Sequence, residues 1–300
     1  MSPANRLIHR TPLKLLSFFS NRKLRSSWSY SPQGHLWRLL FGTGRVVGEV
    51  RDHERKQVSF FCLREDSGTP LWEHRTMKEP WWTGIEAVHR DSLILHGFEK
   101  PDLPEHRRIF VLDLETGQDR WMNDDLTFWF AYQDKVYAHR TLFEKRVGYV
   151  LSLDRGEILE THDNGIEELF EVRQLARREE QADGFLFPNI FEDSRALSKA
   201  ESRMVKQLKH KTVIGNVEVL HKDPFFLYSY HIGVSEQGLD QHLVVLDEQK
   251  GSELFSEVLA RNVPAPVPDS FFVNDSVVYF VKDQNVLVAL PLSTEGEAKE

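Results

Sequence analysis

Acidic and imidazole side chains gather in one short stretch of the chain. His96 is followed by Asp102, Glu105 and His106 within ten residues. Carboxylate and imidazole groups are suitable ligands for a divalent metal ion. Their spacing, however, matches no defined metal motif, and charged residues in a long hairpin loop are usually just solvated. The sequence therefore marks this stretch as a candidate ligand or partner face and predicts no metal site.

A second candidate chemistry is hydrolysis by paired carboxylates. Glu86 lies in a predicted strand, and further acidic side chains follow it at Glu99, Asp124 and Asp125. Two carboxyl groups about 5–10 Å apart are the machinery of glycoside hydrolysis. Thirteen histidines occur, but no Ser-His-Asp arrangement stands out among them, and no phosphate-binding loop is present. The sequence therefore leaves enzyme activity undecided, but it favours a protein without catalytic activity.

Aromatic side chains supply the third candidate surface. Trp81 and Trp82 are adjacent and could form a platform for a ligand or peptide, although large aromatics between elements more often pack. Phe185 and Phe187 lie in an apolar loop over residues 185–191. That loop could plug a central channel or present a groove to a partner, and structural capping is the alternative.

Length and composition limit which functions these three candidate sites can have. The chain has 300 residues, a formal net charge of −8 and one cysteine, Cys62, so it forms no internal disulfide. No apolar run is long enough to span a bilayer, and the overall charge argues against nucleic acid as a partner. Residues 1–25 hold six basic and no acidic residues but lack the features of a secretory signal. We expect a cytoplasmic protein whose arm over 1–26 is frayed or touches a membrane surface.

A repeated phrase organises the rest of the chain. An apolar strand, a turn closed by glycine and a short strand with an apolar anchor recur around Gly68, Gly117, Gly156 and Gly251. The glycines lie 49, 39 and 95 residues apart, and two more strand-like runs precede each phrase. Four short antiparallel strands repeated every 40–50 residues or so are typical of a β-propeller.

We therefore predict an all-β fold, a five-bladed β-propeller over residues 27–292, with a tail over 293–300. The last blade lacks its fourth strand, and Trp28–Tyr30 can supply it, because Trp28 precedes Trp72 by one period of 44 residues. An open β-sandwich is the alternative fold. Residues 164–211 break the repeat with helical spacing, which predicts a helical insertion between blades three and four. A degenerate sixth blade would also fit the gap.

Two stretches resemble known families. The phrase from Leu112 to Trp121 resembles the repeat of PQQ-like propellers, a WD40-like architecture found in quinoprotein dehydrogenases. The run from Glu79 to His106 resembles an uncharacterised bacterial family of domains of unknown function, over about 28–292. The resemblance implies a fold and no activity, and no PQQ or other cofactor is expected, because quinoprotein enzymes carry an adjacent-cysteine pair.

The first functional hypothesis is a non-catalytic propeller that binds a partner protein or small ligand through one loop face. On that face the sequence places the candidate residues Trp81, Trp82, Glu86, His96, Glu99, Asp102, Glu105, His106, Asp124, Asp125, Phe185 and Phe187. The competing hypothesis is a glycosidase-like hydrolase with carboxylates at the mouth of the channel.

Overall fold

A computed structural model describes residues 23–98, 105–143, 145–180, 184–192, 197–235 and 238–293. Antiparallel strands are the main secondary structure in this part of the chain, and they form five sheets of four or five strands. The first three sheets are each built from four successive strands. Sheet 1 contains β2 (His35–Gly42), β3 (Arg45–Asp52), β4 (Gln57–Arg64) and β5 (Pro70–Arg75). Sheet 2 contains β6 (Thr83–His89), β7 (Ser92–Phe98), β8 (His106–Asp113) and β9 (Asp119–Asn123). Sheet 3 contains β10 (Thr127–Tyr132), β11 (Lys135–Leu142), β12 (Lys145–Ser152) and β13 (Ile158–His162).

The last two sheets each gain a short strand from the segment between the helices. Sheet 4 contains β15 (Asn189–Ile190), β16 (Val213–Lys222), β17 (Phe225–Ser235), β18 (Gly238–Asp247) and β19 (Glu253–Val263). Sheet 5 contains β14 (Phe185–Leu186), β20 (Phe271–Asn274), β21 (Val277–Lys282), β22 (Val286–Pro291) and β1 (Trp28–Tyr30). The predicted role of the N-terminal strand is confirmed, because Trp28 pairs with Ala289 of β22.

The repeated phrase forms the turn between the third and fourth strands. In sheet 2, the Asp113 carboxylate accepts hydrogen bonds from the backbone N–H and the hydroxyl of Thr116, both at 2.8 Å. The N–H of Gly117 closes the turn on the Asp113 carbonyl at 2.8 Å. Gly117 has a φ of 68°, a conformation that favours glycine over residues with a side chain. Residue type therefore fixes this turn, as the sequence predicts.

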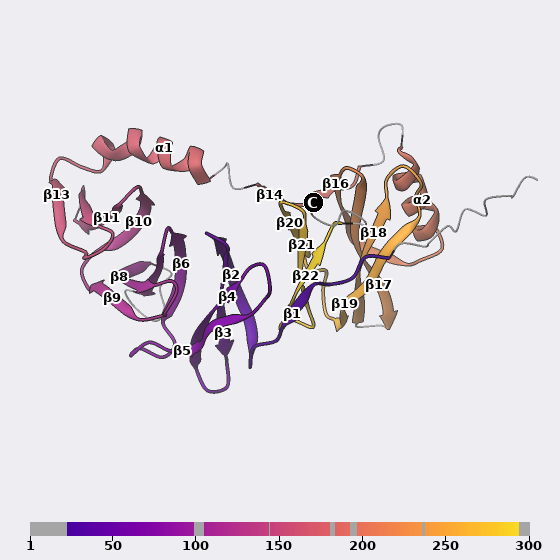
Figure 1. Cartoon of the computed structure of the whole chain (residues 1–300), viewed down its shortest axis with the longest axis horizontal. Helices are drawn as coiled ribbons and strands as arrows, with labels where there is room; N and C mark the ends of the chain where they lie inside the picture. Colours follow the sequence, from indigo (N-terminus) through magenta and orange to yellow (C-terminus); the bar gives the residue numbers. More distant parts are fainter. Residues whose placement is uncertain are drawn as a thin grey trace, which may run out of the picture.

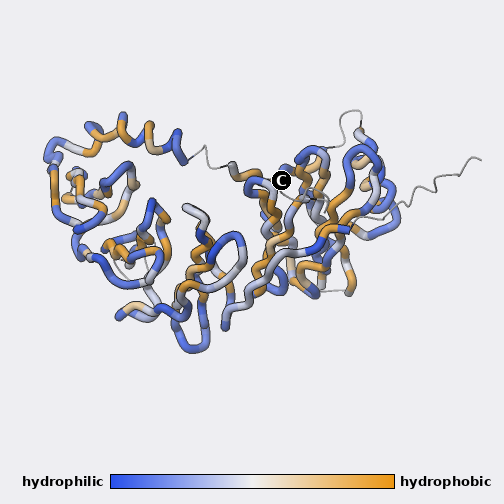
Figure 2. The backbone as a smooth tube through the Cα atoms, in the orientation of Figure 1, coloured by the Kyte–Doolittle hydropathy of each residue, from blue (hydrophilic) through white to orange (hydrophobic). Residues whose placement is uncertain are grey.

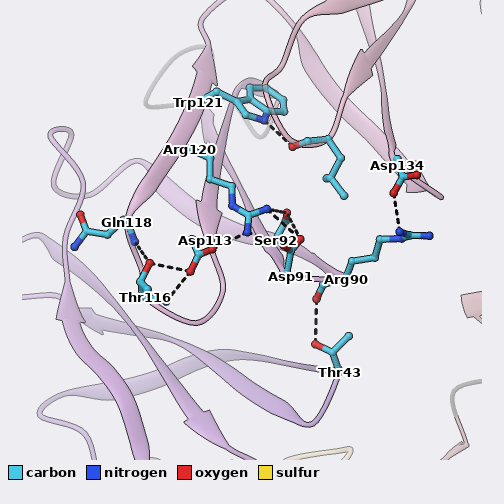
Figure 3. Close-up of polar contacts among 11 residues, drawn as sticks. Thr43, Arg90, Asp91, Ser92, Asp113, Thr116, Gln118, Arg120, Trp121 and Asp134 are labelled. Atoms are coloured by element: carbon cyan, nitrogen blue, oxygen red, sulfur yellow. Dashed lines mark hydrogen bonds and ion pairs between the residues drawn. The ribbon is translucent and has the colours of Figure 1, made fainter.

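Tryptophan side chains connect sheet 5 to sheet 1, sheet 1 to sheet 2 and sheet 2 to sheet 3. Trp28, Trp72 and Trp121 donate their indole N–H to carbonyls in the corresponding turns of sheets 1, 2 and 3, at 2.8 to 2.9 Å. Figure 3 shows the third of these bonds, from Trp121 to the carbonyl of Leu153. A Cβ on Gly156 would lie 2.5 Å from the Trp121 ring, so glycine is needed for this close approach as well as for the turn.

The chain of tryptophan contacts stops at sheet 3. Val111 pairs with Trp121 in sheet 2, and its counterpart Val150 pairs with Glu160 in sheet 3. The carboxylate of Glu160 is half exposed and binds Lys135 at 3.0 Å. A charged side chain cannot replace an indole buried against a neighbouring sheet. The anchor expected at the end of this phrase is therefore absent, and Ile158 and Leu159 are exposed.

Figure 1 shows the consequence for the architecture: the five sheets follow one another along an arc, in the order sheet 3, 2, 1, 5 and 4. Apolar clusters join sheets 2 and 3, sheets 1 and 2, sheets 5 and 1, and sheets 4 and 5. Within the described ranges no such cluster joins sheets 3 and 4. The closed ring that the sequence predicts is thus not confirmed.

Helices cover the outer faces of the two sheets at the ends of the arc. The helix α1 (Phe170–Glu180) follows a short 3₁₀ turn, η1 (Glu167–Leu169), and buries Leu169 and Ala176 against Phe130 and Tyr137 of sheet 3. Figure 2 shows hydrophobic and hydrophilic residues alternating along this helix. The helix α2 (Lys199–Leu208) buries Met204 against sheet 4. Each helix shields a sheet face that has no neighbouring sheet.

Both helices lie where the sequence predicts a helical insertion. Ser198 caps α2 through a capping box with Glu201, as its position before the apolar run suggests. The loop expected over residues 185–191 instead contributes β14 and β15. These strands pair with β20 and β16, the first strands of sheets 5 and 4. No helix in the described part of the chain is long and apolar enough to cross a membrane.

Candidate functional site

Glu86, His96 and His106 come together on sheet 2. They lie ten residues apart on β6, β7 and β8, the three successive strands of this sheet. Glu86 is the extra residue of a β-bulge, because Ile85 pairs with Leu95 and Ala87 with Ile94. A second irregularity follows His96 in the pairing of β7 with β8. Bulges redirect side chains relative to a regular strand, and these two accompany the convergence of the three residues.

The three side chains offer ligand atoms at short range. One ligand atom from each residue lies within 4.8 Å of the other two. Glu86 Oε2 is 2.5 Å from His96 Nδ1 and 3.2 Å from His106 Nδ1. The two imidazole rings are stacked, with centroids 3.5 Å apart and planes 7° from parallel. Glu86 Oε2 and His96 Nδ1 are both buried and lack hydrogen-bond geometry within the described structure, despite their proximity.

Burial and charge set the ionisation of this cluster. Burial lowers the pKa of His96, and the nearby Glu86 and Glu49 carboxylates oppose this effect only in part. Burial raises the pKa of Glu86, but its contacts with His106 and His96 outweigh burial and lower the pKa to about 2. A neutral imidazole and an ionised carboxylate are the forms that bind metal ions.

An aromatic wall, formed by Trp81, Trp82 and Phe98, borders the cluster. The Phe98 ring lies 5.1 Å from that of His96 and 5.4 Å from that of His106, between centroids. Trp82 contacts Phe98 edge to face at 5.8 Å, and Trp81 contacts Trp82 at 6.4 Å. The wall therefore covers one side of the imidazole pair.

A buried ion pair from sheet 1 supports the wall and the bulge. The Arg51 guanidinium donates to Glu49 at 2.6 Å and lies 5.0 Å from the centre of the Trp81 ring. The other oxygen of Glu49 accepts from the N–H of Ile85 at 3.0 Å, next to Glu86. Nothing in the sequence marks Glu49 or Arg51 as special, because only the packing of two sheets brings them to the site.

Glycine at position 84 allows sheets 1 and 2 to pack closely beside the cluster. A Cβ there would lie 2.9 Å from His96 Cε1 and 3.1 Å from Glu49 Oε2. The first contact would force the His96 ring to shift, and the second is tighter than most real Cβ contacts. Gly84 thus lets the imidazole and the buried carboxylate approach each other across the strand.

Glu86 also lines the largest of the described cavities, a central space of 700 Å³. Residues of β2, β6, β10 and α1 line it, together with Phe185 of β14. Glu65 lines it too, and accepts hydrogen bonds from Asn274 and Tyr279. Glu180 binds Arg173 at 2.7 Å. The site thus has one face toward the interior of the arc.

The structure brings together some of the predicted site residues and separates others. Trp82, Glu86, His96 and His106 form one site, with Trp81 beside it. Glu105 is exposed, and Glu99 and Asp102 lie outside the described residues. The carboxylates of Asp124 and Asp125 are exposed near Arg108 and Arg107, at 3.8 and 3.3 Å, and do not line the central cavity. Phe185 and Phe187 each lie 5.9 Å from Phe272 of sheet 5.

Comparisons with known proteins give one family match. A family model described as "Domain of unknown function (DUF4905)" matches residues 42–121, a segment that contains the whole Glu86, His96 and His106 cluster. This match is shorter than the resemblance expected from the sequence. A search of curated proteins finds no match.

Solved structures show only distant similarity. A DUF4221 family member from Bacteroides vulgatus has 8% identity and a TM-score of 0.31, over 90% of this chain and 97% of that one. A bifunctional GH43-CE protein from Bacteroides eggerthii has 11% identity and a TM-score of 0.28, over 90% and 34%. The β-propeller domain of the Trilobed protease from Pyrococcus furiosus, with an open velcro topology, has 10% identity and a TM-score of 0.28, over 84% and 64%. Similarity this low carries no argument about function.

Proposed function

We propose that this protein is a non-catalytic binding protein whose site holds a divalent transition-metal ion at Glu86, His96 and His106. The observation that carries the proposal is the convergence of two imidazoles and one carboxylate within 4.8 Å. Glu86 Oε2 and His96 Nδ1 form an ion pair at 2.5 Å without aligned hydrogen-bond geometry, and buried polar atoms normally have well-aligned partners, so this arrangement calls for an explanation. A bound cation supplies one.

The donor set favours a particular class of ion. Two imidazole nitrogens suit zinc, nickel, copper or iron(II), whereas magnesium and calcium prefer oxygen ligands alone. Tetrahedral zinc with bonds of about 2.0–2.1 Å separates its ligand atoms by about 3.3 Å. The 3.2 Å contact between Glu86 Oε2 and His106 Nδ1 already fits this spacing, and the 2.5 Å contact to His96 Nδ1 would have to open. The stacked rings would also rotate so that their lone pairs converge.

The architecture supports a scaffold role. We interpret the five sheets as blades of an open propeller, in which α1 and α2 cover the two end blades. The repeated indole bonds between successive sheets support this interpretation. A metal ion held beside the aromatic wall would leave a coordination position for a small ligand or a side chain of a protein partner.

The hydrolase alternative requires a pair of carboxylates free for acid–base chemistry. In the central cavity Glu65 is bound to Asn274 and Tyr279, and Glu180 is bound to Arg173. These partners favour structural roles for both carboxylates. Glu86, Glu179 and Asp275 also line this cavity, and the proposal assigns Glu86 to the metal ion. The contacts of Glu65 and Glu180 thus disfavour a hydrolytic pair that includes either of them.

Isothermal titration of the chelator-treated full-length protein tests the metal proposal. We expect one zinc ion to bind per chain and magnesium to show no binding. His106→Asn removes one ligand and should weaken zinc binding by about 100-fold or more. His210→Asn is the matched control, because His210 is exposed and outside the site. Absence of zinc binding, or equal binding by His106→Asn and the wild type at matched thermal stability, would contradict the proposal.

A further inference from the structure

A second polar cavity lies at sheet 4. It has a volume of 560 Å³ and is bounded by β16, β17, the segment around β15 and the proline-rich linker between β19 and β20. Ser229 and His231 line it from β17. They stand two residues apart and so share one face of the strand. Their exposed fractions are only 1% and 4%.

Each of these two residues has a polar atom without a partner in the described structure, namely Ser229 Oγ and His231 Nδ1. The other imidazole nitrogen, Nε2, accepts a hydrogen bond from the N–H of Val267 at 3.1 Å. An imidazole that accepts at Nε2 carries its proton on Nδ1. Burial lowers the pKa of His231, which keeps the ring in this neutral form. Ser229 and His231 therefore offer two hydrogen-bond donors with no acceptor.

The remaining lining is acidic and apolar, with two amide side chains, Asn189 and Asn216. Glu218 holds the linker through the N–H groups of Asp269 and Ser270, at 2.7 and 3.3 Å, and through the Ser270 hydroxyl at 2.6 Å. Glu192 and Asp269 also line the cavity, and among its described lining residues there is no lysine or arginine. Like charges repel, so this lining disfavours an anionic ligand.

Proline side chains complete the wall. Pro188, Pro266 and Pro268 present apolar surface at the cavity. A ligand that fits must accept from Ser229 and His231, donate to carboxylates and place C–H groups on the prolines. Hydroxyl groups both donate and accept. An uncharged polyhydroxy compound meets all three demands, whereas the acidic lining repels a carboxylate and an ammonium group cannot accept a hydrogen bond from Ser229 or His231.

We infer that this cavity is a binding site for an uncharged polyhydroxy compound of monosaccharide size, with Ser229 and His231 as donors. Neither donor atom is accessible to water in the unliganded protein. The linker at Val267 must therefore shift when the ligand enters. Besides Glu218, two side chains hold that linker at Val267: His231 Nε2 accepts from the Val267 N–H, and the Gln241 amide donates to the Val267 carbonyl at 3.2 Å.

Saturation-transfer NMR and calorimetric titration with the full-length protein test this site. The probes are glucose, galactose, mannose and inositol, with glucuronate as the anionic counterpart of glucose. We expect at least one neutral compound to bind with a dissociation constant of about 1 mM or tighter. Glucuronate should bind at least about tenfold more weakly than glucose, because the acidic lining repels its carboxylate.

Ser229→Ala should weaken the binding of that compound by about tenfold, the loss expected for one buried hydrogen bond. Its thermal stability should not fall, because the hydroxyl has no partner in the unliganded protein. Ser256→Ala on the exposed side of β19 is the matched control, and His106→Asn should leave this binding unchanged. The inference is wrong if no neutral compound binds, if glucuronate binds equally well, or if Ser229→Ala binds like the wild type.

Discussion

Arg51→Ala tests the link between the buried ion pair and the site. The Glu49 carboxylate is 2% exposed and has two donors, Arg51 at 2.6 Å and the Ile85 N–H at 3.0 Å. Removing the guanidinium leaves a buried charge with one backbone donor. Breaking a buried ion pair from one side costs about 3–5 kcal/mol. Arg51 also contacts the Trp37 and Trp81 rings, at 5.3 and 5.0 Å, which adds to the loss.

We therefore expect Arg51→Ala to lower the free energy of unfolding by about 4 kcal/mol. Urea unfolding followed by far-ultraviolet circular dichroism measures it without relying on tryptophan fluorescence. Arg55→Ala is the control, because Arg55 is exposed and its 3.7 Å contact with Asp52 contributes little. A double variant, Glu49→Gln with Arg51→Met, should recover much of the loss, since no uncompensated charge stays buried. The reasoning is refuted if Arg51→Ala is as stable as Arg55→Ala, or if the double variant is no better than the single one.

Three further predictions concern the packing around the site and the sheets. Gly84→Ala should cost about 1–3 kcal/mol in urea unfolding, because its Cβ meets His96 and Glu49 at 2.9 and 3.1 Å; wild-type stability would contradict this account of the packing. Trp121→Ala should cost about 3–5 kcal/mol, through the lost indole packing and the lost bond to Leu153, and a loss under about 1 kcal/mol would exclude a structural role for the tryptophan bonds. Burial, aided by Arg146, lowers the pKa of His139 from 6.5, so the unfolded chain binds the proton more tightly. The free energy of unfolding should then fall as pH drops below about 6.5. The urea midpoint of His139→Asn should depend less steeply on pH than that of the wild type, and an equal dependence would contradict this prediction.

The parts of the fold that depend on local residue type could be predicted from the sequence. The aspartate and glycine of each turn fix its geometry within a few residues, so the hairpins follow from the repeated phrase. Trp28 stands one period before Trp72, which predicts that the N-terminal strand joins the last sheet. The helical spacing of residues 164–211 likewise indicates α1 and α2.

The arc ends at sheet 3 because of one residue, Glu160, whose effect is not evident from the repeated phrase. Glu160 occupies the position of Trp121, but the phrase around it still ends in Ile158 and Leu159, so it resembles the other phrases. Only the register of β13 on β12 shows that no aromatic side chain reaches a following sheet. The pairing of β14 and β15 was equally hidden, because two-residue strands have no periodicity to detect.

Glu86, His96 and His106 are all among the residues predicted for one loop face, but their convergence into one cluster could not be predicted. His96 and His106 stand out as imidazoles in a charged stretch, whereas Glu86 joins them only because a bulge alters the register of β6 on β7. Glu49 and Arg51 come from a neighbouring sheet. A motif search along the chain cannot find a site whose ligands lie on three strands, because the distances between them are set by pairing and not by spacing.

Zinc X-ray absorption spectroscopy of the full-length protein loaded with one equivalent of zinc tests the central claim most directly. We predict a first shell of nitrogen and oxygen at about 2.0–2.1 Å, with the multiple scattering of two imidazoles. His106→Asn should lose one imidazole contribution, and His210→Asn should not. A shell of oxygen alone, or two imidazoles that persist in His106→Asn, would show that zinc is not held by Glu86, His96 and His106.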